Sequence, residues 1–183
     1  GYTSAEATEK KILRNVFKQG DAWYNSGDLM RDLGCNHAQF VDRLGDTFRW
    51  KGENVSTNEV ESILGAFPGV EDAVVYGVEI PQTNGRCGMA ALRLSTDTRL
   101  DAKALAAYLD QAMPAYAAPL FIRLLSAVDV TGTFKYKKSD LKQAAYDPEL
   151  CSDPLLVRLP GSKSFEPLTK ALYAKLLQGS YRF

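Results

Sequence analysis

Polar residues and glycines gather at three places in this 183-residue chain, and the first place is the segment from Tyr24 to Asp28. Asp28 precedes an apolar stretch, so we expect its carboxylate at the mouth of a β-strand. A carboxylate placed there can accept hydrogen bonds from two vicinal hydroxyls, such as those of a ribose. Taken alone, the segment is more typical of an aspartate in a Ser-Gly-Asp turn.

The second cluster runs from Val41 to Asn54 and contains Arg43, Gly45 and Gly52. An arginine offers a rigid fork of donors that suits sugar oxygens or a phosphate. A glycine such as Gly45 can absorb the large backbone changes of a hinge, and Gly52 lets the backbone lie against a bulky group. The alternative is a charged hairpin with two turn glycines.

The third cluster runs from Asp129 to Lys138 and places Lys135, Lys137 and Lys138 behind a Thr-Gly-Thr turn. Lysines in this setting can present an ammonium group to a polyanion. A lysine run is, on its own, more often a solvated surface. Each cluster is therefore a weak indication alone, and only their order and separation along the chain make them informative.

The composition excludes several classes of protein. Lys and Arg number 22, as do Asp and Glu, so the net charge is zero and the basic surface of a nucleic-acid binder is absent. Aromatic and basic residues alternate from Phe134 to Lys138, but the neutral charge argues against nucleic acid as a partner. No apolar run approaches the roughly 20 residues that span a bilayer. The start, Gly1 to Ser4, has no Met and no signal-peptide pattern, which predicts a processed chain or a piece of a longer one.

The three cysteines, Cys35, Cys87 and Cys151, have no metal-ligand spacing, so no metal site is expected. We interpret them as reduced thiols in a cytoplasmic protein. The single histidine, His37, lies in a polar stretch between two strand-like runs, and a solvated turn residue is the better interpretation. Cysteine–histidine catalysis is not expected.

The elements that must position these clusters begin with a short helix over residues 4–10. Short extended pieces at residues 23–24, 28–33 and 39–42 predict a small antiparallel meander, and residues 47–51 and 54–56 predict a hairpin. Residues 11–19 stay unassigned. Ser56 and Glu59 have the spacing of a capping box, and a buried helical stripe follows as far as Pro68.

From residue 57 the order helix, strand, strand, helix, strand predicts an α+β domain. Its strands are expected at residues 70–78, 88–94 and 121–125, and its second helix begins near Asp101 and ends at Pro114. This describes a small three-stranded sheet with covering helices, preceded by an N-terminal β-hairpin. The composition changes near residues 146–148, and a last helix is expected over residues 167–178.

Together the clusters resemble the carboxy-terminal motifs of the adenylate-forming (AMP-binding) superfamily, which includes the acyl-CoA synthetases. The resemblance covers essentially the whole chain in four ordered motifs. They are the Tyr-x-x-Gly-Asp motif at Tyr24–Asp28, the Arg-containing hinge motif within Asp42–Glu61, the Leu-Pro-x-Tyr-Met-x-Pro segment at Met113–Pro119 and the lysine motif at Thr133–Lys135.

Two details are similar to the fatty acid transport proteins, or very-long-chain acyl-CoA synthetases, in particular. One is the amino-acid sequence of the hinge segment from Asp42 to Val55. The other is an extended tail that contains Asp153–Leu155 and Pro167–Leu168. Phe134 stands where the superfamily usually has glycine, a replacement typical of this subfamily. The resemblance implies a C-terminal lid domain, preceded by short antiparallel strands from the end of the large domain.

The resemblance also implies roles. Asp28 and Arg43 would bind the ribose of ATP and AMP, and Lys135 would be the catalytic lysine, stabilising charge as the acyl-adenylate forms. Gly45 would be the hinge about which the lid rotates. Rotation would bring Arg49 and Gly52 to the active site in the conformation that accepts CoA. Lys137 and Lys138 stay open as alternatives to Lys135.

By the same resemblance, residues 1–43 end the large N-terminal adenylation domain, residues 44–146 form the mobile lid and residues 147–183 form the subfamily tail. The implied activity joins a long or very long fatty acid to CoA with ATP and Mg²⁺ through an acyl-AMP intermediate. The phosphate-binding loop, the acyl pocket and the magnesium ligands would belong to the large domain, which this chain lacks. We therefore expect the chain alone to be inactive, and pyrophosphate release from ATP and oleate would contradict this.

Two other functions stay open. A fatty acyl-AMP ligase would pass the acyl group to a carrier protein, and a competition between CoA and the carrier would distinguish it. A non-catalytic module could instead contact a membrane or another protein through the apolar tail from Leu155 to Phe183. The expected location is cytoplasmic, with peripheral attachment to the inner face of a membrane as an open possibility.

Overall fold

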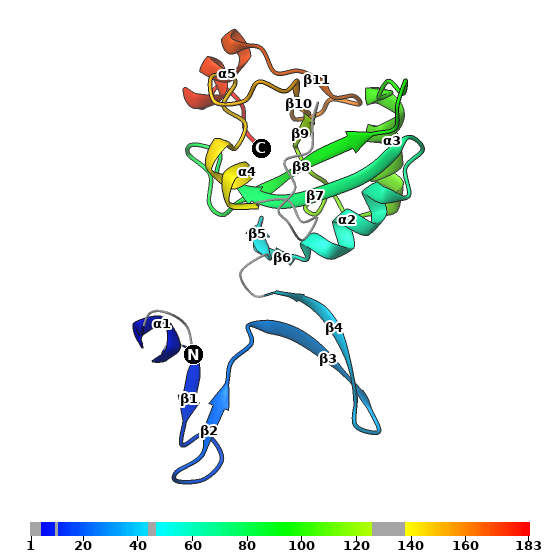
Figure 1. Ribbon diagram of the computed structural model, residues 1–183. Helices are drawn as coiled ribbons and strands as arrows, with labels where there is room; N and C mark the ends of the chain where they lie inside the picture. Colours follow the sequence, from blue (N-terminus) through cyan, green and yellow to red (C-terminus); the bar gives the residue numbers. More distant parts are fainter. Residues whose placement is uncertain (1–4, 10, 44–46, 126–137) are drawn as a thin grey trace. The chain divides into compact units, whose positions relative to one another are not determined.

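The chain divides into two units, Gly1–Gly45 and Asp46–Phe183, which we call the amino-terminal and carboxy-terminal units (Figure 1). The structure is a computed structural model, and it describes residues 5–9, 11–43, 47–125 and 138–183. Each unit is described by itself below.

The amino-terminal unit consists of one short helix and two antiparallel strand pairs. The helix α1 spans Ala5–Glu9, β1 (Ile12–Arg14) pairs with β2 (Ala22–Tyr24), and β3 (Asp28–Gly34) pairs with β4 (His37–Arg43). These elements confirm the predicted helix and the predicted strands. The single meander was wrong, because β2 pairs with β1 and not with β3, so the strands form two separate pairs. The strand β1 lies in the stretch that the sequence left unassigned.

The carboxylate of Asp21 stabilises the loop that connects β1 to β2. The Asp21 side chain accepts backbone N–H groups from Val16, Phe17 and Lys18 at 2.8, 3.0 and 3.1 Å. The Trp23 indole N–H donates to the same carboxylate at 2.8 Å. Desolvation is the largest single effect and raises the Asp21 pKa, but the four donors together outweigh it and hold the pKa at about 2.

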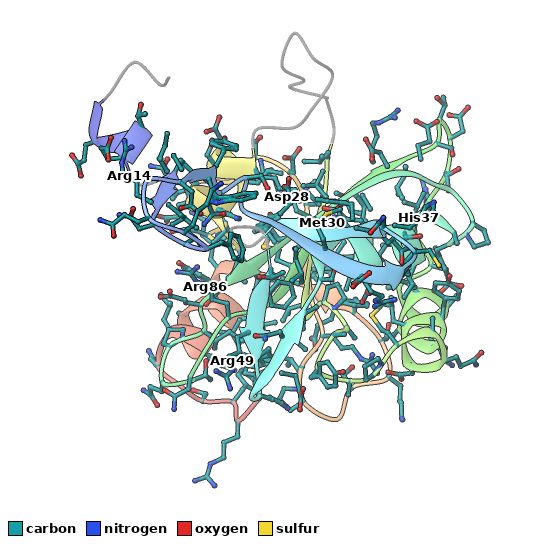
Figure 2. The ribbon with its side chains drawn as sticks, turned by 90° about the horizontal axis from the view of Figure 1, so that it is seen from below. Arg14, Asp28, Met30, His37, Arg49 and Arg86 are labelled. Atoms are coloured by element: carbon teal, nitrogen blue, oxygen red, sulfur yellow. The ribbon has the colours of Figure 1, made fainter. Side chains whose placement is uncertain are left out.

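The amino-terminal unit leaves much apolar surface uncovered. Nine of the eleven large hydrophobic side chains exposed among the described residues belong to it: Leu13, Val16, Phe17, Trp23, Tyr24, Leu29, Met30, Leu33 and Phe40. Exposed apolar side chains gathered in one unit are typical of a surface that contacts another part of a protein. Figure 2 shows Asp28, Met30 and His37 along the β3–β4 hairpin, with His37 near its turn.

The carboxy-terminal unit is built on one five-stranded sheet, in the order β11-β10-β9-β8-β7. Strands β7 (Val70–Val78) and β8 (Cys87–Leu94) are antiparallel, and β9 (Phe121–Leu124) is parallel to β8. These three are the predicted strands. The sheet is wider than expected, because β10 (Leu155–Val157) and β11 (Glu166–Pro167) from the tail continue it beyond β9.

Both faces of this sheet are buried. Tyr76, Met89 and Phe121 are cross-strand neighbours on one face, where the Tyr146 ring stacks on Phe121 with centroids 4.1 Å apart. The helix α4 (Lys138–Ala144) precedes Tyr146, and α5 (Lys170–Leu177) supplies Tyr173, whose ring meets Tyr146 edge-on at 5.8 Å. The sequence had not predicted α4.

The helices α2 (Thr57–Gly65) and α3 (Ala102–Ala112) are the two predicted helices, and Figure 1 shows α2 running beside β7. The Ser56 hydroxyl accepts the Glu59 N–H at 3.4 Å, as the predicted cap requires. Asp101 caps α3 in the same way, accepting from Lys103 and Ala104. The Tyr108 hydroxyl donates to the Ile63 carbonyl at 3.0 Å and so ties α3 to α2.

The tail is part of the core of the carboxy-terminal unit. Five of its apolar side chains, Leu155, Val157, Phe165, Leu168 and Leu176, are buried, so they are not available for contact with a membrane. The helix α5 begins at Lys170 rather than at residue 167, because Thr169 caps it by accepting the Leu172 N–H and β11 occupies Glu166–Pro167. In the described residues, no helix is long and apolar enough to cross a membrane.

Candidate functional site

The hairpin of β5 (Phe48–Trp50) and β6 (Glu53–Val55) carries the predicted Arg49 and Gly52. The two strands are joined by Lys51 and Gly52, both with positive φ, 51° and 87°. Two central residues with positive φ are typical of a type I′ turn, whose twist matches that of the strands it connects. Glycine at the second position removes the strain that a side chain would add there.

The hairpin buries one face and exposes the other. Phe48 and Trp50 are only 5% and 3% exposed, whereas Arg49, which lies between them, points to solvent. The Arg49 Nε donates to the Gly52 carbonyl at 3.1 Å, so the guanidinium group lies over its own turn. A Cβ added at Gly52 would meet no atom within 4 Å, and the space above the turn is therefore open.

The loop before β8 contacts the backbone of β5 and holds the hairpin in place. The Arg86 N–H donates to the Arg49 carbonyl at 2.7 Å, and Trp50 forms a β-bridge with Gly85. Gly85 has a φ of +91°, and a Cβ there would lie 2.3 Å from the Arg49 carbonyl oxygen. Figure 2 labels Arg49 and Arg86, which come from these two neighbouring segments. The contact of Gly85 with the hairpin has no local signal in the sequence, because the two segments lie far apart in the chain.

A hollow of about 580 Å³ borders the hairpin at Trp50 and Lys51. Four basic side chains line it, and three of them come from the tail: Lys51, Arg158, Lys163 and Arg182. Lys51, Lys163 and Arg182 form no ion pair with any described residue. This concentration of cations in an otherwise neutral chain suits a ligand with several phosphate groups.

One carboxylate in the hollow is already neutralised. Arg158 forms a two-pronged pair with Asp110 at 2.8 and 2.7 Å, and its Nε donates to the Ser162 carbonyl at 3.0 Å. The hydrogen bonds from Arg158 lower the pKa of Asp110, against the effect of desolvation. The charge of Lys163 also lowers the Asp110 pKa, so Arg158 and Lys163 share the one side-chain carboxylate among the described residues that line the hollow. The sequence did not indicate Arg158, Lys163 or Arg182, because the fold alone brings the tail to the hairpin.

A second hollow, of about 630 Å³, lies between the loop of residues 79–86, the end of α4 and the helix α5. Its charged groups are occupied: Arg86 pairs with Glu79 at 3.1 Å, and Asp147 accepts the Glu149 N–H at 2.8 Å. We do not assign it a ligand.

In the amino-terminal unit, Asp28 and Arg43 are direct cross-strand partners in the β3–β4 ladder. Opposite residues in an antiparallel pair have Cα atoms about 5 Å apart, so both predicted ribose-binding positions lie at one end of the hairpin. A turn leads into Asp28, in which Asn25 Oδ1 accepts the Gly27 N–H at 2.9 Å and Ser26 Oγ accepts the Asp28 N–H at 3.2 Å. Their role in binding a ribose stays a prediction.

Gly45, Lys135 and Lys137 lie outside the described residues. Lys138, the remaining alternative lysine, lies inside them as the first residue of α4. Its ammonium group is 2.9 Å from Glu61 Oε1 and 3.5 Å from Thr57 Oγ1. The free thiols Cys87 and Cys151 are buried, and burial raises the pKa of each. No group of side chains in the described part of the chain could hold a metal ion.

Comparison with known proteins gives a family match. Residues 59–135 match the family model described as the AMP-binding enzyme C-terminal domain. A medium/long-chain-fatty-acid–CoA ligase of Mycobacterium tuberculosis, FadD6, is 48% identical over 167 residues, covering 91% of this chain and 28% of that protein. Human long-chain fatty acid transport protein 1 is 44% identical over 181 residues, covering 99% of this chain and 28% of that protein.

Solved structures show the same fold. The o-succinylbenzoate CoA synthetase of Bacillus subtilis, in complex with its acyl-adenylate intermediate, has a TM-score of 0.64 and 25% identity, covering 77% of this chain and 27% of that chain. The ATP-bound MatB of Rhodopseudomonas palustris has a TM-score of 0.66 and 20% identity, covering 82% and 28%. This chain thus spans less than a third of the length of the proteins it matches.

Proposed function

Because this chain belongs to the AMP-binding, adenylate-forming enzyme family and carries its carboxy-terminal domain, we propose that the whole protein is an ATP-dependent ligase of long-chain or very-long-chain fatty acids and CoA. The fatty carboxylate attacks the α-phosphorus of ATP and releases pyrophosphate. The CoA thiol then attacks the acyl carbon of acyl-AMP and releases AMP. The observation that carries the proposal is the docked β5–β6 hairpin, whose open turn borders a cationic hollow.

The first half-reaction is assigned to Asp28, Arg43 and Lys135. The cross-strand register of Asp28 and Arg43 supports a shared ligand, since a diol needs acceptors and donors within a few ångströms of each other. Lys135 is assigned the charge that develops on the carboxylate and the α-phosphate. An ammonium group stabilises such charge without transferring a proton.

The second half-reaction is assigned to the hairpin. The open space above Gly52 accommodates the pantetheine arm, and Arg49 faces the reacting centre from the exposed side of β5. The hollow beside Lys51 then takes the phosphates of the CoA nucleotide, because Lys163 and Arg182 supply unpaired positive charge there. Acyl transfer from acyl-AMP to the thiol needs no new protein nucleophile.

We assign the change from the first half-reaction to the second to a rotation of the carboxy-terminal unit about Gly45. The boundary between the two units falls directly after this residue, which supports a pivot there. The proposed large domain covers the exposed apolar side chains of the amino-terminal unit, and it supplies the acyl pocket, the phosphate loop and the Mg²⁺ ligands. ATP, CoA and Mg²⁺ are the proposed cofactors, and a fatty acid is the substrate.

We place the enzyme in the cytoplasm. All three cysteines are free and one of them, Cys35, is exposed, as expected in a compartment that keeps thiols reduced. Peripheral association with the inner face of a membrane would then have to use a surface other than the buried apolar residues of the tail.

Two substitutions in the full-length enzyme test the division of labour. Lys135→Ala is expected to lower the rate of adenylation about 10²- to 10³-fold, because charge stabilisation in the transition state is lost. It should leave CoA transfer from preformed acyl-AMP intact. Lys163→Glu is expected to raise the KM for CoA about three- to tenfold, because a cation of the hollow becomes an anion. It should leave adenylation unchanged.

The measurements are pyrophosphate release from ATP and a fatty acid, and acyl-CoA formation from synthetic acyl-AMP. Lys175→Glu, at an exposed site in α5 away from the residues that line this hollow, is the matched control for charge reversal. Equal loss of both half-reactions in Lys135→Ala would refute the assignment of this lysine. An unchanged KM in Lys163→Glu would refute the CoA role of the hollow.

A further inference from the structure

An ion pair holds the start of α4 against α2. The Lys138 ammonium group lies 2.9 Å from Glu61 Oε1, and it donates to the hydroxyl of the fully buried Thr57 at 3.5 Å. The Lys138 and Glu61 side chains are 26% and 21% exposed, so solvent screens this pair less than a surface pair. Two residues of α2 thus fix one residue of α4.

Glu61 also forms a hydrogen bond with the sheet, so the Lys138–Glu61 pair is connected to β7. The same oxygen, Oε1, accepts the Val75 N–H at 2.8 Å. Since β7 is the edge strand of the sheet, N–H groups on its outer side have no strand partner and need another acceptor. The carboxylate therefore joins α2, β7 and α4, and removal of either charge would leave the other partly buried and unpaired.

Lys138 is also close in sequence to the lysine assigned to adenylation. Lys138 follows Lys135 by three residues and is the first described residue after the lysine motif. Leu125, the last described residue before this stretch, is fixed by its own N–H, which donates to the Leu92 carbonyl at 2.9 Å. The chain on either side of Lys135 is therefore tied to the sheet.

We propose that Lys138 is a positioning residue for Lys135 and not itself a group that touches the substrate. The proposal rests on the proposed function. The Lys138 ammonium group already contacts two acceptors of its own unit, Glu61 and Thr57. It would lose both contacts if it bound a nucleotide. Its contribution is to hold the first turn of α4, which follows the lysine motif in the sequence, against α2 and β7.

The test compares Lys138→Met, Lys138→Arg, Glu61→Gln and the double variant Lys138→Met/Glu61→Gln in the full-length enzyme. The two neutralising single variants should each lower the kcat of adenylation about tenfold, since small displacements of a reacting group cost this much or more. The KM for ATP and CoA transfer from preformed acyl-AMP should change less than about twofold. Lys138→Arg should restore most of the rate, and the double variant should be no slower than either single variant.

A structural readout accompanies the kinetics. Amide hydrogen exchange at Val75 should become faster in Glu61→Gln than in the parent enzyme, while exchange at Leu92 in β8 stays unchanged. This measurement remains informative if a variant is poorly active for any other reason.

Two results would overturn the proposal. Loss of adenylation in Lys138→Met as severe as in Lys135→Ala, with Glu61→Gln near the parent rate, would make Lys138 itself a catalytic residue. Unchanged adenylation in all four variants would deny the pair any positioning role. Failure of the proposed function looks different, because the parent enzyme would then release no pyrophosphate with any fatty acid, while Val75 exchange would still report the pair.

Discussion

At Gly85 a hydrogen atom in place of a side chain lets the Arg49 carbonyl approach and accept the Arg86 N–H. The hairpin face to which we assign CoA binding therefore depends on a residue outside the proposed site. Arg49 and Gly52 are exposed and contribute little to packing, whereas their neighbours Phe48 and Trp50 are buried. Successive side chains of a β-strand point to opposite faces, so β5 can bury Phe48 and Trp50 while it exposes Arg49, the residue proposed to act in the second half-reaction.

Gly85→Ala should lower the free energy of unfolding of the chain by about 2–4 kcal/mol, because strain at positive φ adds to a backbone clash. Gly161→Ala is the matched control, since Gly161 also has a positive φ of 77° but meets no atom within 4 Å. It should cost only about 1 kcal/mol. Urea unfolding followed by fluorescence of the buried Trp50 measures both, and equal costs would contradict the role of the clash.

The tail matters at the scale of elements. It adds two strands to the edge of β9 and the helix α5 to one face of the sheet. At the same edge, Arg123 pairs with Asp153 at 2.8 Å, with side chains only 14% and 8% exposed. The tail is thus packed as part of the sheet rather than appended to it, and it also supplies three of the four cations of the hollow.

Substitutions of two adjacent leucines in α5 test whether the tail contributes to the stability of the core. Leu176→Ala should lower the free energy of unfolding by about 2–5 kcal/mol, because Leu176 is 1% exposed and its loss leaves a cavity. Leu177→Ala should change it by less than about 0.5 kcal/mol, because Leu177 is 45% exposed. Thermal unfolding compares the two variants. A neutral Leu176→Ala would show that the tail does not contribute to the core.

At the scale of the whole molecule, two buried tyrosines set the response to alkali. Burial raises the pKa of Tyr76 and of Tyr146 far above the usual value near 10. The Tyr146 hydroxyl donates to the Glu79 carbonyl at 2.9 Å, whereas the Tyr76 hydroxyl has no hydrogen-bond partner among the described residues. Between the unfolded and folded pKa values, the folded chain binds more protons, so stability falls as the pH rises above about 10.

Each of these tyrosines should contribute a loss of about 1.4 kcal/mol per pH unit in that range. Tyr76→Phe should remove one such contribution and should also raise stability at neutral pH by about 1 kcal/mol, because an unpaired buried hydroxyl disappears. Tyr146→Phe should remove the other but cost about 1 kcal/mol at neutral pH, because a hydrogen bond is lost. Unfolding measured from pH 7 to 11 gives both, and identical neutral-pH effects would contradict the difference in partners.

Local signals predicted much of the fold. Apolar patterns located β7, β8 and β9, the capping box at Ser56 located the start of α2, and an amphipathic pattern from about Asp101 located α3. Local signals failed where a distant partner stabilises a short element. The strand β1 depends on the carboxylate of Asp21, α4 begins at a lysine held by Glu61, and β10 forms because β9 offers an open edge.

The sequence by itself indicated the family, and it predicted the reaction class and the residues that we propose for each half-reaction, since these predictions rest on the order and spacing of motifs along the chain. Only the tertiary structure decided that the tail completes the sheet, that its cations meet the hairpin, and that Lys138 is held by Glu61. The reason is physical. Motifs record short-range requirements of chemistry and turns, whereas contacts between residues far apart in the chain arise only when hydrophobic burial and strand pairing bring them together.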